Sequence, residues 1–207
     1  MFRRVQSLLF GLLVVASAWF MSSGLFRPAI ALAPSESLAQ AVQEIEQLDV
    51  LRSGLAATLK DATEPPTPET MQEVCKPVGM KAKQISQEHG WQVKQISRQY
   101  RNPEHAPTLL AEKKALAKFR ANPDLMGFWE PETVADQSGT RYYRRINVEA
   151  SCLACHGSKD SHPQFIQDRY PQDLAFGFQE GDLRGMYAVF MPDLEPNRVP
   201  AYTGVAN

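Results

Sequence analysis

The pentapeptide Cys152-Leu153-Ala154-Cys155-His156 constrains this chain more than any other feature of its sequence. Two cysteines that are separated by two residues and followed directly by a histidine have the spacing by which a polypeptide becomes covalently joined to haem c. The two thiols add to the two vinyl groups at one porphyrin edge, and the histidine then offers an imidazole nitrogen to the iron. The motif therefore predicts one covalently attached haem, bound by Cys152, Cys155 and His156.

Two other chemistries use the same Cys-x-x-Cys spacing. One is a dithiol redox pair, and the other is a zinc site completed by Cys75 and by His156 or His162. Neither explains why a histidine follows the second cysteine directly. A closed zinc site usually takes its ligands from two closely spaced pairs, whereas this chain has three cysteines in all and no second pair. The motif thus favours haem over both alternatives.

The N-terminal segment predicts export. Arg3 and Arg4 precede an uncharged stretch over residues 5–26, and Ala29-Ile30-Ala31 offers the small residues that a signal peptidase recognises. We expect residues 1–31 to be a signal peptide that is cleaved after Ala31. The alternative is a retained membrane anchor, because the uncharged stretch approaches the ~20 residues that span a bilayer. In either case we expect the protein in the periplasm or the thylakoid lumen, with membrane contact only if the segment is retained.

The charge balance argues against a nucleic-acid partner. Three of the 22 basic residues and none of the 23 acidic residues lie in the first 31 positions, so the mature chain would carry a formal charge of about −4. It contains no basic runs. We expect a mildly acidic chain of single-domain size, whose partner is a redox or signalling protein that the sequence does not identify.

Hydrophobic periodicity predicts an α+β domain. We expect helices at Ser37–Lys60, Met71–His89 and around Leu109–Phe119, and strands at Trp91–Ser97, Gly127–Val134, Arg141–Val148 and Met186–Met191. Within Met71–His89, Pro77 is expected to place the strong helix start just after Lys76, with Cys75 near its N-terminal end, and Gly90 is expected to be a left-handed C-cap. The connections expected between them are a proline-rich linker at Ala62–Glu69, a loop at Arg101–Pro107, a hairpin turn at Asp136–Gly139, mixed helix and loop at Ser161–Gln172, and a turn at Gly181–Gly185. Residues 32–62 would form an N-terminal helix and residues 63–207 the haem domain.

The residue that binds iron opposite His156 is not decided by the motif. Cys75, Met126, Met186, Met191, His89, His105 and His162 all compete for that position. Methionine is the usual partner of a c-type haem. Cys75 also has a purely structural interpretation, because it lies on the expected apolar stripe of the Met71–His89 helix and cysteine often packs as a small buried side chain.

An ordered set of short motifs resembles one family. The set comprises Arg101-Asn102-Pro103, the helix around Glu112 and Leu116, Arg141-Tyr142-Tyr143, the haem motif with Gly157, Tyr170-Pro171 and Gly181-Asp182-x-x-Gly185. From Ser37 to Met191 the chain resembles the PAS-like c-type haem domain family, formerly a domain of unknown function. Its members are exported single-domain proteins of cyanobacteria and extracytoplasmic sensor regions of bacterial signalling proteins. The resemblance implies a PAS-like antiparallel sheet with flanking helices, and an iron held between His156 and Cys75.

Two functions follow from this resemblance. The first is a low-potential redox or gas sensor, in which a thiolate ligand favours ferric iron and leaves on reduction. The alternative is an electron-transfer cytochrome that keeps both ligands through the redox cycle. We expect no enzymatic activity, because the chain shows no acid–base constellation beyond isolated residues.

The strand at Arg141–Arg145 supplies candidate partners for the haem propionates. Alternation places Arg141, Tyr143 and Arg145 on one side and Arg144 on the other. Either set could meet the propionates, and the alternative is that these arginines are solvent-exposed charges on a hairpin. His162 is expected to be a surface residue in a polar loop.

Overall fold

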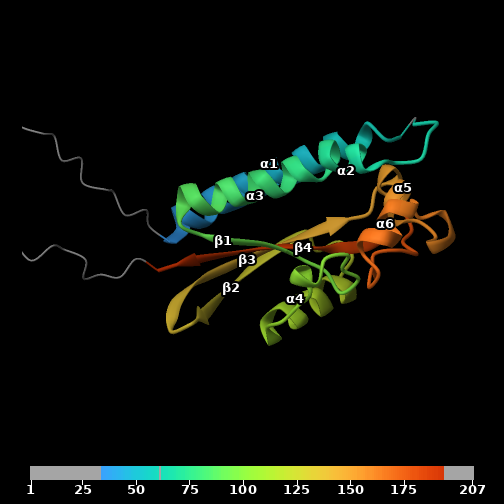
Figure 1. The fold of residues 1–207 in the computed structure, drawn as a ribbon. Coiled ribbons are helices and arrows are strands. Elements are labelled where there is room, and N and C mark those ends of the chain that lie inside the picture. The colour runs from blue at the N-terminus through green and yellow to red at the C-terminus, as the bar shows by residue number, and fades with distance from the viewer. Residues whose placement is uncertain (1–33, 61, 194–207) are drawn as a thin grey trace, which may run out of the picture. The chain divides into compact units, whose positions relative to one another are not determined.

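The computed structural model describes residues 34–60 and 62–193, in which helices cover both faces of one sheet (Figure 1). The sheet in this part of the chain is antiparallel, with four strands in the order β1-β4-β3-β2. The strands are β1 (Gln92–Ile96), β2 (Gly127–Val134), β3 (Gln137–Asn147) and β4 (Leu183–Pro192). Helices α1 (Pro34–Ala57) and α3 (Lys76–His89) cover one face, and α4 (Leu110–Ala121) packs on the other. The expected α+β class with an antiparallel sheet is confirmed.

The remaining elements are short. They are α2 (Pro68–Val74), α5 (Leu153–His156), α6 (Gln164–Arg169) and 3-10 turns at Pro103–His105, Ala150–Cys152 and Lys159–Ser161. Helices α2, α5 and α6 gather at one end of the sheet in Figure 1. The expected signal peptide at residues 1–31 and the end of the expected haem domain, residues 194–207, lie outside the described residues. Within the described ranges, no helix is long and apolar enough to span a bilayer.

One hydrophobic core lies between the α1–α3 layer and the sheet. Ala41, Ile45 and Leu48 of α1 are fully buried there, at intervals of three and four residues that keep them on one helical face. Val78 and Ile85 of α3 join them. The sheet contributes Tyr142, Ile146, Tyr187, Val189 and Met191 to the same core. Because α1 shares this core, the expected N-terminal helix packs within the domain.

A second core lies between α4 and the opposite face of the sheet. Its members are Ile96, Ala115, Leu116, Phe119, Phe128, Tyr143, Met186 and Ala188. Glu112, which is 1% exposed, lies in the first turn of α4 and caps its start: its Oε2 accepts hydrogen bonds from the backbone N–H groups of Thr108 (2.8 Å) and Leu109 (3.0 Å). A carboxylate at this position satisfies amides that the first helical turn leaves without partners.

Two turn predictions were wrong in detail. The hairpin turn is tighter than expected, because Val134 pairs with Gln137 and only Ala135 and Asp136 lie between the strands, both with positive φ. Two residues of this conformation match the twist of the flanking strands. Strand β4 begins at Leu183, inside the segment expected to be a turn.

A β-bulge explains the error at β4. Ile146 pairs with Gly185, but the next residue of β3, Asn147, pairs with Leu183. Arg184 is therefore an extra residue in the ladder, and a bulge of this kind redirects a side chain from the normal alternation. The alternation that the sequence predicts for β4 consequently ends at this position.

The expected Met71–His89 helix is interrupted at Cys75. Helix α2 ends at Val74 and α3 begins at Lys76. Pro77 has no N–H to donate to the carbonyl of residue 73, so a continuous helix cannot pass this point without losing a hydrogen bond. Cys75 thus lies at the junction of two helices, and Gly90 ends α3 in the left-handed conformation that was expected of it.

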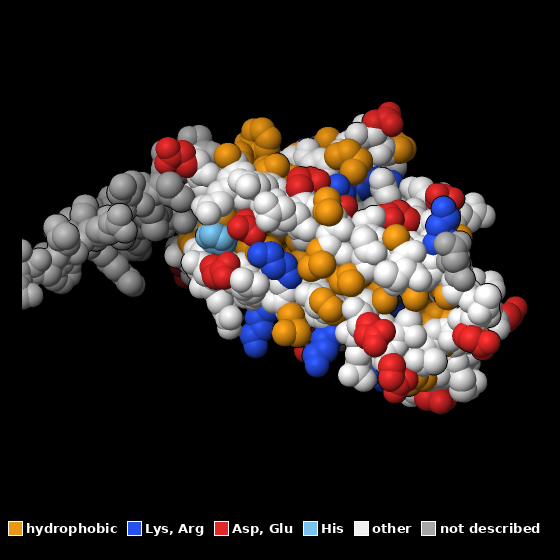
Figure 2. Space-filling model, turned by 90° about the horizontal axis from the view of Figure 1, so that it is seen from above, with side chains coloured by type: hydrophobic (Ala, Val, Ile, Leu, Met, Phe, Trp, Pro, Cys, Tyr) orange, Lys and Arg blue, Asp and Glu red, His pale blue; other side chains and the backbone are white. Residues whose placement is uncertain are grey.

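The outer surface carries both signs of charge. In Figure 2, which views the molecule from above the α1–α3 layer, acidic, basic and apolar side chains are interspersed rather than gathered into a patch of one sign. This distribution agrees with the formal net charge of −1 for the whole chain.

The close approach of β4 to β1 gives a stability prediction. A Cβ at Gly185 would lie 2.4 Å from the carbonyl oxygen of Ile96, so the Gly185→Ala variant should lose about 1–3 kcal/mol of unfolding free energy. A Cβ at Gly79 of α3 would meet no atom within 4 Å, and Gly79→Ala should gain about 0.5–1 kcal/mol. Urea denaturation of the two variants measures both effects, and equal stabilities would contradict the packing described.

Candidate functional site

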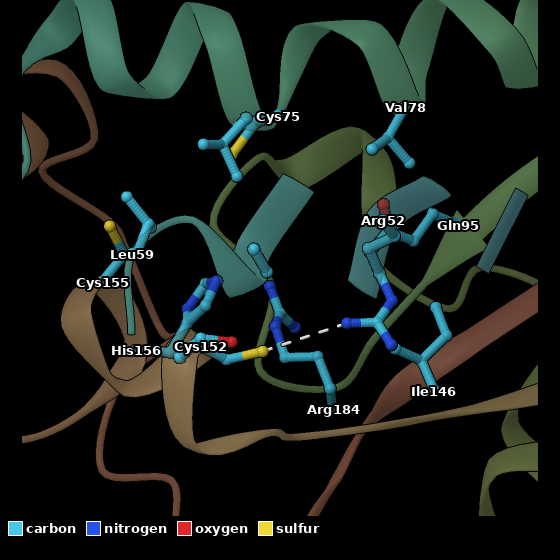
Figure 3. Close-up of a pocket in the computed structure, with 13 residues that line it drawn as sticks. Arg52, Leu59, Cys75, Val78, Gln95, Ile146, Cys152, Cys155, His156 and Arg184 are labelled. Atoms are coloured by element: carbon cyan, nitrogen blue, oxygen red, sulfur yellow. Dashed lines mark hydrogen bonds between the residues drawn. The ribbon is translucent and has the colours of Figure 1, made fainter. Parts of the chain in front are cut away.

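A cavity opens at the end of the sheet where α2 and α5 lie. Its space, with the solvent at its mouth included, is about 740 Å³. The side chains that line it come from α1 and the residues just after it, the α2–α3 junction, strands β1, β3 and β4, and the haem motif with Ser151 (Figure 3). They are Arg52, Ala56, Leu59, Val74, Cys75, Val78, Gln95, Ile146, Ser151, Cys152, Cys155, His156 and Arg184. Apolar walls that enclose a few polar groups are typical of cofactor sites.

The motif is held against α1 by Glu149, which directly precedes its first short turn. The Glu149 carboxylate accepts hydrogen bonds from Arg52 Nη2 (2.8 Å) and Ser53 Oγ (2.7 Å). Its carbonyl accepts a bond from the backbone N–H of Cys152 (2.9 Å). Partial burial would raise the pKa of Glu149, but the hydrogen bonds from Ser53 and Arg52 and the charge of Arg52 outweigh it and lower that pKa. The segment that follows β3 is thus fixed against α1, and this contact places both cysteines at the cavity.

His156 has the tautomer that a metal ligand requires. Its Nδ1 lies 2.8 Å from the carbonyl oxygen of Ala175, which can only accept, so Nδ1 carries the hydrogen. The lone pair is then on Nε2, and the structure gives that atom no hydrogen bond among the described residues. Burial, followed by the charges of Arg184 and Arg101, holds the pKa of His156 well below its usual range. His156 is therefore a neutral imidazole with Nε2 available to a metal.

A second layer of contacts fixes this ring. Asp173 accepts a hydrogen bond from the backbone N–H of Ala175 (2.7 Å) and pairs with Arg101 Nε (3.0 Å). Arg101 Nη2 also donates to the carbonyl of Cys155 (2.6 Å). The Arg101-Asn102-Pro103 motif thus supports the haem motif. Support of this kind orients a ligating histidine and raises its basicity.

The three cysteines are free thiols. Burial raises the pKa of Cys155 to about 11 despite the opposing charge of Arg101. Desolvation by the surrounding cavity wall raises the pKa of Cys75, although part of its side chain is exposed. Both side chains are accordingly protonated at neutral pH. Thiols in this state are inert towards oxidation until a partner activates them.

Cys75 lies on the helix side of the cavity, across from the motif (Figure 3). The residue is exposed, so the interpretation of Cys75 as a small core side chain was wrong. The break at Pro77 explains this outcome, because the apolar stripe drawn through a continuous helix does not continue through the junction. The fold therefore brings all four candidate residues, Cys75, Cys152, Cys155 and His156, to the wall of one cavity.

The other six candidates for the second iron ligand lie elsewhere. Met186 and Met191 are buried in the two cores, and Met126 is 41% exposed ahead of β2. His89 stacks on Trp91 at the far end of α3. His105 lines a separate groove beside β1. None of these side chains, nor that of His162, lines the cavity.

Comparison with known proteins gives the family. The family model described as Tll0287-like (Tll0287) matches residues 31–192, which is most of the chain. The chain belongs to the Tll0287-like family. A solved structure, described as that of the cyanobacterial heme-protein Tll0287, is 50% identical with a TM-score of 0.70, and the match covers 79% of this chain and 99% of that one. No curated protein matches the chain. The family resemblance inferred from the ordered motifs is confirmed.

In this member of the Tll0287-like family, the arginines of β3 do not reach the cavity. Arg141 is 1% exposed and pairs with Glu132 on the α4 side. Arg144 pairs with Glu46 and Asp49 of α1, at 3.0 and 3.1 Å. The interpretation of these arginines as solvent-exposed charges was wrong, and neither Arg141 nor Arg144 lines the cavity. Neighbouring carboxylates that are distant in sequence compensate these buried guanidinium groups.

Arg145 of the same strand is 4% exposed, and its hydrogen bonds also stabilise the fold. Its side chain donates to Asn147 Oδ1 and to the carbonyl of Phe119 (2.8 Å). Burial lowers the pKa of Arg145. This arginine joins β3 to the end of α4, on the face of the sheet away from the α1–α3 layer.

Two other arginines line the cavity, and sequence reasoning missed both. Arg52 interrupts the apolar stripe of α1, since it stands four residues after Leu48 and seven before Leu59. A charged residue within a buried stripe was the signal that could have identified it. Arg184 is the extra residue of the β4 bulge, and no spacing rule marks such a position in advance.

His162 is 7% exposed, so its expected surface position was wrong. Its Nδ1 lies 3.7 Å from Asp173 Oδ2, and its ring meets Phe176 edge-on. Burial and then the charge of Arg101 lower the pKa of His162. The segment after the motif folds back onto Asp173, and this contact buries a histidine that local polarity placed at the surface.

The zinc alternative gains no support from this geometry. In the described part of the chain, no group of three or more His, Cys, Asp or Glu side chains is arranged to hold a metal ion. A closed zinc site needs four protein ligands. A haem iron needs far fewer, because the porphyrin itself supplies four nitrogens.

Proposed function

We propose that this chain is an exported c-type haem protein with one covalently attached haem. The observation that carries the proposal is the cavity wall on which Cys152, Cys155, His156 and Cys75 meet. Each motif thiol adds across one vinyl double bond, so that sulfur bonds to carbon and the hydrogen moves to the neighbouring carbon. The neutral His156 and its available Nε2 fit an axial ligand. The Tll0287 relative, described as a heme-protein, supports the binding of haem.

We further propose that Cys75 binds the iron opposite His156. Of the seven side chains that sequence analysis leaves in competition, Cys75 alone lines the cavity. When bound, the haem supplies one-electron redox chemistry. A Cys75 thiolate donates charge to the iron and favours its ferric state, so the reduction potential would lie well below that of a His/Met cytochrome.

The position of Cys75 favours a sensor over a plain electron carrier. Helix α2, which precedes Cys75, has no buried residue. Elements with few buried apolar contacts open at low free-energy cost. When one electron from a partner reduces the iron, Cys75 would take up one proton from solvent and move away with α2. The departure of Cys75 would open a coordination position to a small molecule and change the surface that a signalling partner contacts.

Ligand binding after reduction tests this sensor proposal. We expect carbon monoxide or nitric oxide to change the absorption spectrum of the dithionite-reduced protein within minutes, because Cys75 no longer occupies the iron. Carbon monoxide should leave the ferric spectrum unchanged. A reduced spectrum that stays constant for hours under carbon monoxide would contradict a labile Cys75 and support an electron-transfer cytochrome that keeps both ligands.

A further inference from the structure

Arg184 reaches the cavity because of the β-bulge. As the extra residue between Leu183 and Gly185, it is released from the alternation of β4, and its side chain lines the cavity beside the haem motif (Figure 3). Its guanidinium lies over the Phe178 ring, with the Cζ atom 5.4 Å from the ring centroid. Phe178 in turn meets the His156 ring edge-on. Arg184 is thus linked to His156 through their shared contacts with Phe178.

The hydrogen bonds of Arg184 are to neutral groups. Its Nη1 donates to Ser97 Oγ and to the carbonyl of Gln99, at 3.0 Å each. Ser97 Oγ also donates to the carbonyl of Arg184 (2.6 Å), which fixes the base of the side chain. In the described ranges, no carboxylate forms an ion pair with this guanidinium.

The other two guanidinium groups near the cavity are compensated. Arg52 pairs with Asp49 (2.7 Å) and Glu149 (2.8 Å), and Arg101 pairs with Asp173 (3.0 Å). Burial, and then the like charge of Arg101, lowers the pKa of Arg184 to about 10. The group therefore stays charged at neutral pH although its surroundings disfavour the charge. The side chain is partly buried. A partly buried cation without a counter-ion is unfavourable, and an anion bound beside it removes that cost.

We propose that Arg184 forms the ion pair with a propionate carboxylate of the haem bound in this cavity. This inference rests on the proposed function, which supplies the haem. The second anion that the cavity could hold is the Cys75 thiolate. A thiolate on ferric iron already has its charge opposed by the metal, whereas a propionate keeps its full charge and needs a cation. A planar guanidinium also matches a carboxylate geometrically.

The reduction potential and the ferric spectrum together distinguish the two anions. Arg184→Gln should make the midpoint potential more negative, because an uncompensated propionate favours the more positive ferric iron. The ferric absorption and EPR spectra should keep their wild-type form. Arg184→Lys retains the charge and should show a smaller shift. Arg169→Gln, which removes an exposed arginine of α6, serves as the control and should leave the potential unchanged.

Each outcome decides the proposal. An unchanged potential in Arg184→Gln would overturn the proposal. A less negative potential, together with a ferric spectrum that has lost thiolate ligation, would also overturn it, because Arg184 would then stabilise the Cys75 thiolate and not a propionate. If Arg184→Gln fails to load haem, normal loading of Arg184→Lys would support a required charge, and failure of both would overturn the pairing. A wild-type protein without haem would instead refute the proposed function.

Discussion

The Cys75→Ala variant is expected to have a changed ferric spectrum and a raised reduction potential. Loss of the thiolate removes the ligand that favours ferric iron over ferrous iron. If that preference is about a hundredfold, its loss raises the potential by about 120 mV, because a tenfold change in a one-electron equilibrium corresponds to 59 mV. Redox titration of the purified holoprotein, followed by absorption, measures the shift.

Val78→Ala is the matched control for this variant. Val78 lines the same cavity from α3 but carries no ligand atom, so its truncation should leave the spectrum in place. If Cys75→Ala retains the wild-type ferric spectrum and potential, Cys75 is not an iron ligand. If both variants change the spectrum equally, the effect arises from packing in the cavity wall and not from the thiol.

Replacement of both motif cysteines, Cys152→Ala with Cys155→Ala, is expected to abolish covalent attachment. Without either thioether bond, acidified organic solvent should extract all the haem, whereas the wild-type protein should retain it. Mass spectrometry of the denatured protein provides the measurement: the wild type should carry the mass of one haem and the double variant none. Leu153→Ala, which changes the motif without touching a thiol, should keep the haem mass. Retention of the haem mass by the double variant would contradict the attachment.

The sequence predicted the elements of this fold well where local rules operate. The apolar intervals of α1, the left-handed Gly90 and the proline-rich linker all depend on neighbours a few residues away. The errors occur where partners distant in sequence decide the outcome. Arg144 is buried because Glu46 and Asp49 of α1 neutralise it, and no pattern within β3 contains that information.

The candidate site likewise contains residues that local sequence predicts and residues that only the tertiary structure identifies. The three motif residues follow from five consecutive positions, whereas Cys75 enters the cavity because Pro77 ends a hydrogen-bonded run and displaces the thiol from the apolar stripe. Arg184 depends on a single extra residue in a β-ladder, which only the pairing of β3 with β4 defines. The sequence thus predicts the residues proposed to anchor the haem, and the tertiary pairing determines the groups that surround them.

Low-temperature EPR of the ferric wild-type protein tests the central claim most directly. Ligation by His156 and the Cys75 thiolate predicts a low-spin signal with the narrow spread of g values that thiolate ligation produces. The signal should disappear in Cys75→Ala and persist in Val78→Ala. A broad low-spin signal typical of two neutral axial ligands, or a high-spin signal in the wild type, would contradict the account.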